Sequence, residues 1–330
     1  MATGVVTPAD EGALLAAARS GDDRAFERLL EPHRRALHLH CYRLLGSLHD
    51  ADDALQETSL RAWQGLDRFA PRAPFRAWLF RIATNVCLRA IERRARTPAA
   101  LDPMEAEIAA YLQPYPDRLL PTDLAAEQRE SVGLAFVSVM QLLPPRQRAS
   151  LVLHDVLGWS AKEVADALGD SVASVNSALQ RARGKLERER AAGRLARDHA
   201  PASPEVEARL IQRFVAAWEA VDFDGIVELL SDDAVMTMPP EPMRLVGTTA
   251  IGDFFRTVPA DGALERIRLV PARANCQPAV AAYLEDESGF QAYGVMVFAL
   301  EGDSVSGITG FAGYPELFPE LGLPLRLDPR

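Results

Sequence analysis

The sequence predicts a multidomain chain in which two all-α units, the second a helix-turn-helix, precede an α+β domain. Apolar residues recur every three or four positions through residues 10–96 and 124–192, which is the periodicity of helices. The proline-dense segment 97–123 separates the two units as a linker, because proline interrupts long helices. One long helix at 205–220 then precedes short β-type runs, which places an α+β domain at 205–325.

The elements of the α+β domain are predicted in chain order. Prolines in the segment 200–204 mark the break before its first helix. The β-type runs that follow are at 234–238, 265–270, 280–284, 293–300 and 304–309. A helix followed by strands of this kind is typical of α+β domains.

The net charge of -10 is unevenly distributed along the 330 residues. Residues 1–100 and 132–199 each carry a net charge of +3, whereas 101–131 carry -5 and 200–330 carry -11. Both helical units therefore remain candidates for DNA contact, because the local charge matters more than the sum. No apolar run approaches the roughly 18 residues that a membrane-spanning helix needs, and the first residues do not resemble a secretory signal. We expect a cytoplasmic protein without membrane contact.

The cysteines and histidines are spaced unlike those of a disulfide framework or a zinc site. Cys41, Cys87 and Cys276 lie far apart and form no Cys-x-x-Cys pair. His38 and Cys41 share a helix face, so a metal site there is an alternative, but a closed zinc site takes four ligands. We predict no metal and no cofactor.

A helix-turn-helix is predicted between residues 142 and 186. Ser160 and Glu163 form a capping box, which begins the second helix of the motif. Gly169 ends that helix because glycine readily adopts the left-handed conformation, and Ser171 caps the third helix directly afterwards. A short helix, a tight turn and a longer helix form the arrangement that many proteins use to read DNA.

The third helix of this motif has an apolar stripe and an opposite polar face. The stripe consists of Val172, Val175, Leu179, Ala182 and Leu186. The candidate DNA contacts are Ser171, Ser174, Asn176, Ser177, Gln180, Arg181, Arg183 and Lys185. Hydroxyl and amide groups can reach base edges, while basic side chains meet phosphates. The alternative is an ordinary helical hairpin with a solvated charged face.

Three stretches of the helical units resemble RNA polymerase sigma factors of the sigma-70 family. The runs DADDALQETSLRAW at 50–63 and FRAWLFRIATNVCLRAIERR at 75–94 resemble the second conserved region, and residues 142–186 resemble the fourth. The third sigma domain is missing, as in the extracytoplasmic-function (ECF) class. The resemblance implies a factor that binds core RNA polymerase and directs promoter recognition and transcription initiation. It implies contacts with the clamp helices of the largest subunit and the flap of the second largest, and it leaves open whether an anti-sigma protein exists.

The resemblance assigns the DNA contacts to two promoter elements. The eight candidates of the helix-turn-helix form the minus-35 surface. The minus-ten surface consists of Asp67, Arg68, Arg72, Arg81, Asn85, Arg89 and Arg93. Asn85 matches an asparagine that the family uses near the minus-ten element, although it could simply bond solvent or a loop. The loop at 64–74 pockets an unstacked base in the family, where Phe69 either stacks or plugs the core.

The last four of these minus-ten residues lie at four-residue spacing, which places them on one helix face. Phe75, Trp78, Leu79, Ile82 and Val86 form a buried stripe on another face of the same helix. Asp52, Asp53, Gln56 and Glu57 form an acidic surface on the preceding helix. The resemblance implies that this polymerase surface meets the basic clamp helices, where opposite charge orients the complex.

The acidic C-terminal third resembles the cone-shaped α+β domain of the SnoaL-like (polyketide-cyclase) superfamily. Phe214 and Trp218 on its first helix, the run at 229–235 and the curved sheet carry this resemblance. It implies a ligand cavity, for which the candidate lining is Trp218, Met236, Met238, Phe254, Tyr283, Tyr293 and Phe298. The alternative is that these side chains are simply core.

No catalytic residues are predicted in this third. All six histidines lie at or before His199, so a histidine acid/base pair within the domain is impossible. A carboxylate assisted by a tyrosine remains an alternative, which would make the protein an isomerase or cyclase fused to DNA-binding helices. A free-standing transcriptional regulator is a further alternative. We favour a regulatory module that senses a small molecule or docks on the sigma domains.

Overall fold

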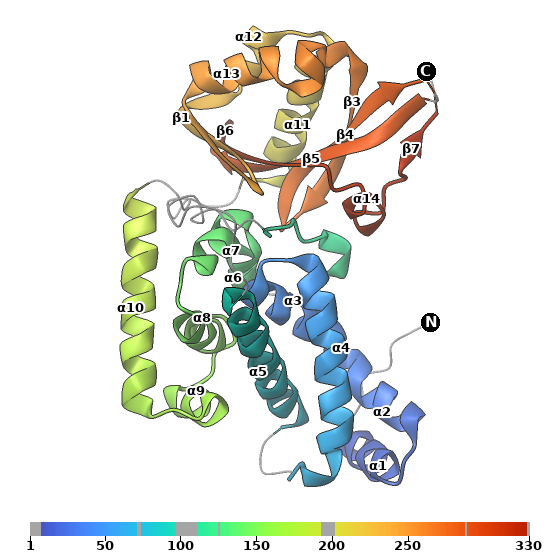
Figure 1. Cartoon of the computed structure of the whole chain (residues 1–330), viewed down its shortest axis with the longest axis vertical. Helices are drawn as coiled ribbons and strands as arrows, with labels where there is room; N and C mark the ends of the chain where they lie inside the picture. Colours follow the sequence, from blue (N-terminus) through green and yellow to red (C-terminus); the bar gives the residue numbers. More distant parts are fainter. Residues whose placement is uncertain are drawn as a thin grey trace. The chain divides into compact units, whose positions relative to one another are not determined.

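The computed structural model describes residues 8–70, 74–96, 111–124, 126–192, 202–287 and 289–328. The chain divides into two compact units, each of which is discontinuous in sequence (Figure 1). The helical unit comprises Met1–Ala100, Leu119–Ser131 and Met140–Arg188. The C-terminal unit comprises Leu101–Arg118, Val132–Val139 and Glu189–Arg330. Parts of the segment predicted as a linker therefore belong to the C-terminal unit.

The first part of the helical unit is built around a bundle of α3, α4 and α5. Its elements are α1 (Pro8–Arg19), α2 (Asp23–Leu30), η1 (Glu31–His33), α3 (Arg34–Leu45), α4 (Leu48–Gly65), η2 (Leu66–Arg68) and α5 (Phe75–Arg96). His40 on α3 is fully buried, and its ring nitrogen Nε2 lies 2.8 Å from the Thr84 hydroxyl on α5. Burial, followed by the nearby Arg43 charge, lowers the pKa of His40 from 6.5 to about 3. The imidazole is therefore neutral in the core at ordinary pH.

The second part contains the predicted helix-turn-helix. Its elements are α6 (Ala126–Arg129), η4 (Glu130–Val132), α8 (Pro145–Leu151), η5 (Val152–Val156), α9 (Ala161–Leu168) and α10 (Val172–Ala191). Most of η3 (Asp117–Leu119) and of α7 (Leu134–Gln141) belongs to the C-terminal unit. The capping box of Ser160 and Glu163 is confirmed at the start of α9. Gly169 ends that helix in the left-handed conformation with a φ of 64°. The Ser174 amide donates to the Ser171 hydroxyl at 3.1 Å, which confirms the cap of α10.

One position of the predicted stripe on α10 is wrong. Val175, Leu179, Ala182 and Leu186 are buried, whereas Val172 is 44% exposed. Val172 is the first residue of the helix, and helical side chains lean toward the N-terminus. It therefore points past the packed part of the helix into solvent.

The C-terminal unit is a curved mixed sheet packed against helices, as expected for an α+β domain (Figure 1). Its helices are α11 (Pro204–Glu219), α12 (Phe223–Val227), α13 (Thr248–Thr257) and α14 (Leu317–Glu320), with short turns η6 (Pro259–Gly262) and η7 (Leu264–Arg266). Its strands are β1 (Leu230–Met238), β2 (Glu241–Val246), β3 (Ile267–Ala274), β4 (Gln277–Asp286), β5 (Gly289–Glu301), β6 (Ser304–Ala312) and β7 (Arg326–Leu327). Strand order is β2-β1-β6-β5-β4-β3, and β7 pairs with β5. β1 and β6 run parallel, whereas the other pairs are antiparallel.

Aromatic side chains from the helices and the sheet form the core of this unit. Phe214 and Trp218 of α11 meet Phe255 of α13 and Phe298 of β5, with centroid distances of 4.9 Å for Phe214–Phe298 and 5.5 Å for Trp218–Phe255. The Trp218 indole donates to the Ile267 carbonyl at 3.2 Å, which satisfies its polar atom. Within the parts of the chain that the structure describes, no helix is both long and apolar enough for a membrane span.

Candidate nucleic-acid interface

The exposed face of α5 presents a row of basic side chains. Arg81, Arg89 and Arg93 are exposed, and Asn85 between them is half-buried. Their four-residue spacing brings them to one side of the helix. The Asn85 amide nitrogen donates to the Arg81 carbonyl at 2.8 Å, within its own helix. The face can therefore offer guanidinium groups to phosphates and one amide to a base edge.

The turn before α5 offers two more charged groups. Asp67 and Arg68 are exposed on η2, whereas Arg72 lies outside the described residues. Phe69 is only 5% exposed, and its ring packs 5.5 Å from that of Phe75 and 5.0 Å from that of Trp78. The Phe69 ring therefore packs in the core in this structure, and a stacking role for it stays a prediction.

The polar face of α10 is accessible over most of its length. Asn176, Gln180 and Arg181 are exposed, while Ser174, Ser177 and Lys185 are half-buried. The Arg181 guanidinium donates to the Ser177 hydroxyl at 2.6 Å, which orders it along the helix. Arg181 and Ser177 therefore lie on the same face of α10.

Arg183 differs from its neighbours on α10, because it is paired with Asp155. The two guanidinium–carboxylate distances are 2.9 and 2.6 Å. Burial tends to raise the pKa of Asp155, but hydrogen bonds from Arg183 and His154 outweigh it and lower that pKa below its ordinary value. Arg183 must share its charge between Asp155 and any phosphate.

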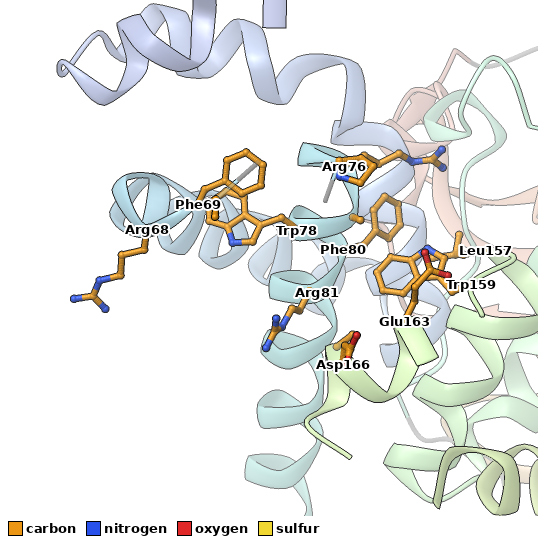
Figure 2. A pocket seen from close by; sticks show the side chains of 14 residues that line it. Arg68, Phe69, Arg76, Trp78, Phe80, Arg81, Leu157, Trp159, Glu163 and Asp166 are labelled. Atoms are coloured by element: carbon orange, nitrogen blue, oxygen red, sulfur yellow. The ribbon is translucent and has the colours of Figure 1, made fainter. Parts of the chain in front are cut away.

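In this arrangement α9 lies against the face of α5. The Asn85 amide nitrogen is 3.5 Å from the Ala167 carbonyl of α9. A pocket of about 590 Å³ opens between the start of α5 and α9 (Figure 2). Its lining is Arg68, Phe69, Ala70, Pro74, Arg76, Ala77, Trp78, Phe80, Arg81, Leu157, Trp159, Glu163, Asp166 and Ala167. Asn85 is therefore partly covered by the helix-turn-helix.

Two buried arginines join the two halves of the helical unit. Arg148 on α8 is 3% exposed and donates to the Leu44 carbonyl at the end of α3, at 2.5 Å. Arg43 on α3 is 2% exposed and donates to the Ser131 hydroxyl at 2.7 Å. Because the C-terminal carbonyls of a helix carry partial negative charge, a cation is favourable there. Neither arginine was predicted to be buried, and the signal for it in the sequence is an arginine at an apolar helix position.

The acidic surface on α4 is accessible. Asp52, Asp53 and Gln56 are exposed and Glu57 is half-buried. Asp52 lies 3.1 Å from His38 Nε2, and Glu57 lies 2.6 Å from the Arg61 guanidinium. Leu60, one turn from Gln56, is 50% exposed and was missed by the sequence analysis. The α4 face thus combines carboxylates with an apolar side chain, a composition that suits a protein partner.

The seven candidate cavity residues do not all meet. Trp218, Met236, Phe254 and Phe298 are buried in one hydrophobic cluster, with Met238 and Tyr293 packed against it. Tyr283 instead packs its ring 5.0 Å from Phe318 and donates its hydroxyl to the Pro324 carbonyl at 2.9 Å. The ligand cavity stays a prediction. Among the described residues, no group of three or more His, Cys, Asp or Glu side chains could hold a metal ion.

Comparison with known families identifies three parts of the chain. The sigma-70 region 2 model matches residues 29–97, and the sigma-70 region 4 model matches residues 134–186. A SnoaL-like domain model matches residues 211–306. These matches and the fold define a sigma-70-type transcription factor with a SnoaL-like C-terminal domain.

The relatives specify the class further. The ECF RNA polymerase sigma factor SigG of Mycobacterium tuberculosis is 43% identical over 336 residues, covering 96% of this chain and 86% of SigG. The ECF sigma factor SigE of Mycolicibacterium smegmatis is 33% identical over 190 residues, 55% of this chain and 69% of SigE. The crystal structure of the M. tuberculosis ECF sigma factor SigJ matches with a TM-score of 0.59 at 25% identity, over 89% of this chain and 97% of SigJ.

The chain belongs to the extracytoplasmic-function RNA polymerase sigma factors. As a member of this family it binds core RNA polymerase and directs promoter recognition and transcription initiation.

Proposed function

We propose that the minus-ten and minus-35 surfaces carry the promoter recognition of this sigma factor, and that α4 carries its polymerase surface. The observation that supports this most is the exposed arginine row around Asn85 on α5. Arginines follow the phosphate backbone, while the amide has the donor and acceptor needed for a base edge. The boundaries of the sigma regions and of the linker, as predicted from the sequence, belong to the same proposal.

Replacement of Asn85 tests the minus-ten assignment. We expect Asn85→Ala to lower promoter-dependent transcription by core polymerase about tenfold or more, the effect of losing one specific base contact. Arg28→Ala is the matched control, because Arg28 is exposed on α2 and outside the proposed surface. Equal transcription by the two variants would contradict the assignment.

The contact between α9 and α5 is, in our proposal, a resting arrangement that opens on the promoter. The two promoter elements are roughly 25 base pairs apart, or about 85 Å at 3.4 Å per base pair. Asn85 and Ala167 are 3.5 Å apart, so α5 and the helix-turn-helix must separate before both elements are bound. The buried bonds of Arg148 and Arg43 are lost or replaced in that step.

Energy transfer between two dyes tests this opening. We place the dyes at Glu92→Cys and Glu187→Cys, which are exposed positions on α5 and α10 outside the proposed DNA-binding residues, in a Cys276→Ser background. The native Cys41 and Cys87 are buried and should not react. We expect transfer to fall when core polymerase and promoter DNA are added. Unchanged transfer would contradict the resting arrangement.

The C-terminal domain is proposed to modulate the sigma factor rather than to catalyse a reaction. Its candidate polar groups include Tyr283, whose hydroxyl is already bonded to a backbone carbonyl. The aromatic cluster fills the space between α11 and the sheet. We also propose that the sigma factor is located in the cytoplasm, because the RNA polymerase on which it acts is cytoplasmic.

A further inference from the structure

A segment of the linker is hydrogen-bonded to the β3–β4 turn of the C-terminal domain. The Tyr115 backbone amide donates to the Asn275 side-chain oxygen at 2.7 Å, and the Asn275 backbone amide donates to the Tyr115 carbonyl at 2.7 Å. Pro116 pairs with Ala274 as an antiparallel bridge next to these bonds. The linker therefore continues the edge of the sheet for a short distance.

The same turn also holds the chain on the other side of α6. The Asn275 side-chain nitrogen donates to the Val132 carbonyl at 2.7 Å. The Leu134 amide, at the start of α7, donates to the Gln277 side-chain oxygen at 2.8 Å, and Gln277 in turn donates to the Phe298 carbonyl at 3.2 Å. Gln277 thus satisfies an amide at the N-terminus of α7, where helices leave amides without an internal partner.

The contact is buried, which distinguishes it from an ordinary surface turn. Asn275 and Tyr115 are 0% exposed, although hairpin turns usually face water. Asn275 has a φ of 58°, a left-handed conformation that asparagine tolerates better than most residues. A buried amide side chain must find partners for its donor and acceptor, and the Val132 carbonyl and the Tyr115 amide supply them.

Charged residues border this contact. The Asp117 carboxylate accepts from the Cys276 amide at 2.8 Å and lies 3.3 Å from the Arg273 guanidinium. Arg273 also lies 2.5 Å from Glu207 of α11, so Asp117 joins a pair within the domain. Arg118 lies 2.5 Å from the Glu320 carboxylate. These ion pairs are part-exposed, so the buried hydrogen bonds of Asn275 carry more of the stability.

We propose that this linker strap, the segment 115–118 together with 132–134 on the β3–β4 turn, sets the distance over which the two sigma regions can separate. The fully extended chain from Arg96 to Leu134 spans at most about 125 Å. With the strap docked, Tyr115 and Leu134 are held at one turn, so the reach from the end of α5 to the strap is limited by the length of residues 96–115, which span at most about 65 Å.

The difference in reach between the docked and the released linker matters for promoters with different spacing between their two elements. The inference rests on the sigma function proposed above, in which α5 and α10 bind elements roughly 85 Å apart. The sigma regions themselves add to the reach, so the docked tether accommodates a narrow range of spacings and the released tether a wide one. A tether that cannot span two sites contributes no effective concentration, whereas one that spans them raises it strongly. The strap makes the C-terminal domain a determinant of promoter-spacer length.

The first experiment measures the strap itself in the full-length protein. Asn275→Gly keeps the left-handed backbone but removes the side-chain bonds to Tyr115 and Val132. We expect trypsin to cleave after Arg118 at least about tenfold faster in this variant, since a loss of 1.4 kcal/mol changes an opening equilibrium tenfold. Asp303→Ala is the control, because it removes the ion pair with Arg209 elsewhere in the same domain. Equal cleavage in all three proteins would overturn the strap.

A second variant separates the two anchor points and guards against a folding defect. Gln277→Leu removes the acceptor of the Leu134 amide without changing the bonds of Tyr115. Hydrogen exchange should increase at the start of α7, while cleavage after Arg118 stays at the wild-type rate. Exchange that rises evenly over the whole C-terminal unit would indicate unfolding and would overturn the use of Gln277 as a separate anchor.

The second experiment varies the spacer of a promoter obtained by run-off transcription of genomic fragments with core polymerase. Spacers lengthened by up to three base pairs should reduce wild-type transcription about tenfold and that of Asn275→Gly about threefold or less. No promoter-specific transcription by the wild-type protein would contradict the sigma function. Normal transcription with identical spacer profiles for both proteins would overturn the distance function and leave the sigma function intact.

Discussion

His40 makes the stability of the first helical part dependent on pH. Its imidazole is fully buried between α3 and α5, close to Thr84, and its pKa is lowered from 6.5 to about 3, mainly by burial. The unfolded chain therefore binds a proton below pH 6.5 that the folded chain does not bind until about pH 3. This stability is fully present above pH 6.5 and is lost as the pH falls through that window.

The magnitude follows from the two pKa values. One pH unit changes the free energy of unfolding by up to about 1.4 kcal/mol for a single proton. Acidification from pH 7.5 to 5.0 crosses about 1.5 units below the unfolded pKa, so this histidine removes about 2 kcal/mol. That amount is a large fraction of the stability of a typical domain.

Hydrogen exchange of the α3 amides at pH 7.5 and 5.0, corrected for intrinsic rates, measures this local free energy in the full-length protein. We expect the wild-type opening free energy to fall by about 2 kcal/mol and that of His40→Asn to change little. His49→Asn is the control, because the His49 side chain is 78% exposed and should leave the wild-type response intact. The same pH response in His40→Asn and wild type would refute the reasoning.

Three further predictions concern the proposed surfaces. Arg181→Ala should weaken binding of minus-35 duplex DNA by about 1 to 3 kcal/mol in fluorescence anisotropy if it reads a base, and unchanged affinity would remove it from the interface. Charge reversal by Asp53→Lys with Glu57→Lys should reduce capture of core polymerase while circular dichroism stays unchanged, because exposed charges add little to stability; undiminished capture would reject α4 as the polymerase surface. Truncation after Arg197, which lies outside the described residues, should increase promoter-specific transcription at matched salt, whereas equal activity would count against modulation by the C-terminal domain.

Local signals explain why much of the helical unit could be predicted. The capping box of Ser160 and Glu163 and the glycine end of α9 involve contacts within a few residues, which the sequence displays directly. The basic row on α5 follows from four-residue spacing alone. The β-type runs were predicted for the same reason, although all five corresponding strands extend further than expected, and β2, β7, α12, α13 and α14 were not predicted.

Contacts between distant segments were not predictable from these signals. Arginine is usually a surface residue. Arg148 and Arg43 are buried because they bond to the opposite half of the helical unit, far away in the sequence. Asn275 and Tyr115 are separated by 160 residues, so no local pattern relates them. The aromatic residues of the SnoaL-like domain were selected as cavity lining or core, and hydrophobic pattern alone does not distinguish the two.

The 160 residues between Tyr115 and Asn275 also impose an order on synthesis. At about 5 to 20 residues per second, the ribosome makes Asn275 about 8 to 30 seconds after Tyr115. Both sigma regions have left the ribosome by then and have time to fold, because small helical domains fold in far less than a second. During this period the linker of each new molecule has no β3–β4 turn to bond to. A nascent chain that meets polymerase in that period does so before its C-terminal domain has been synthesised.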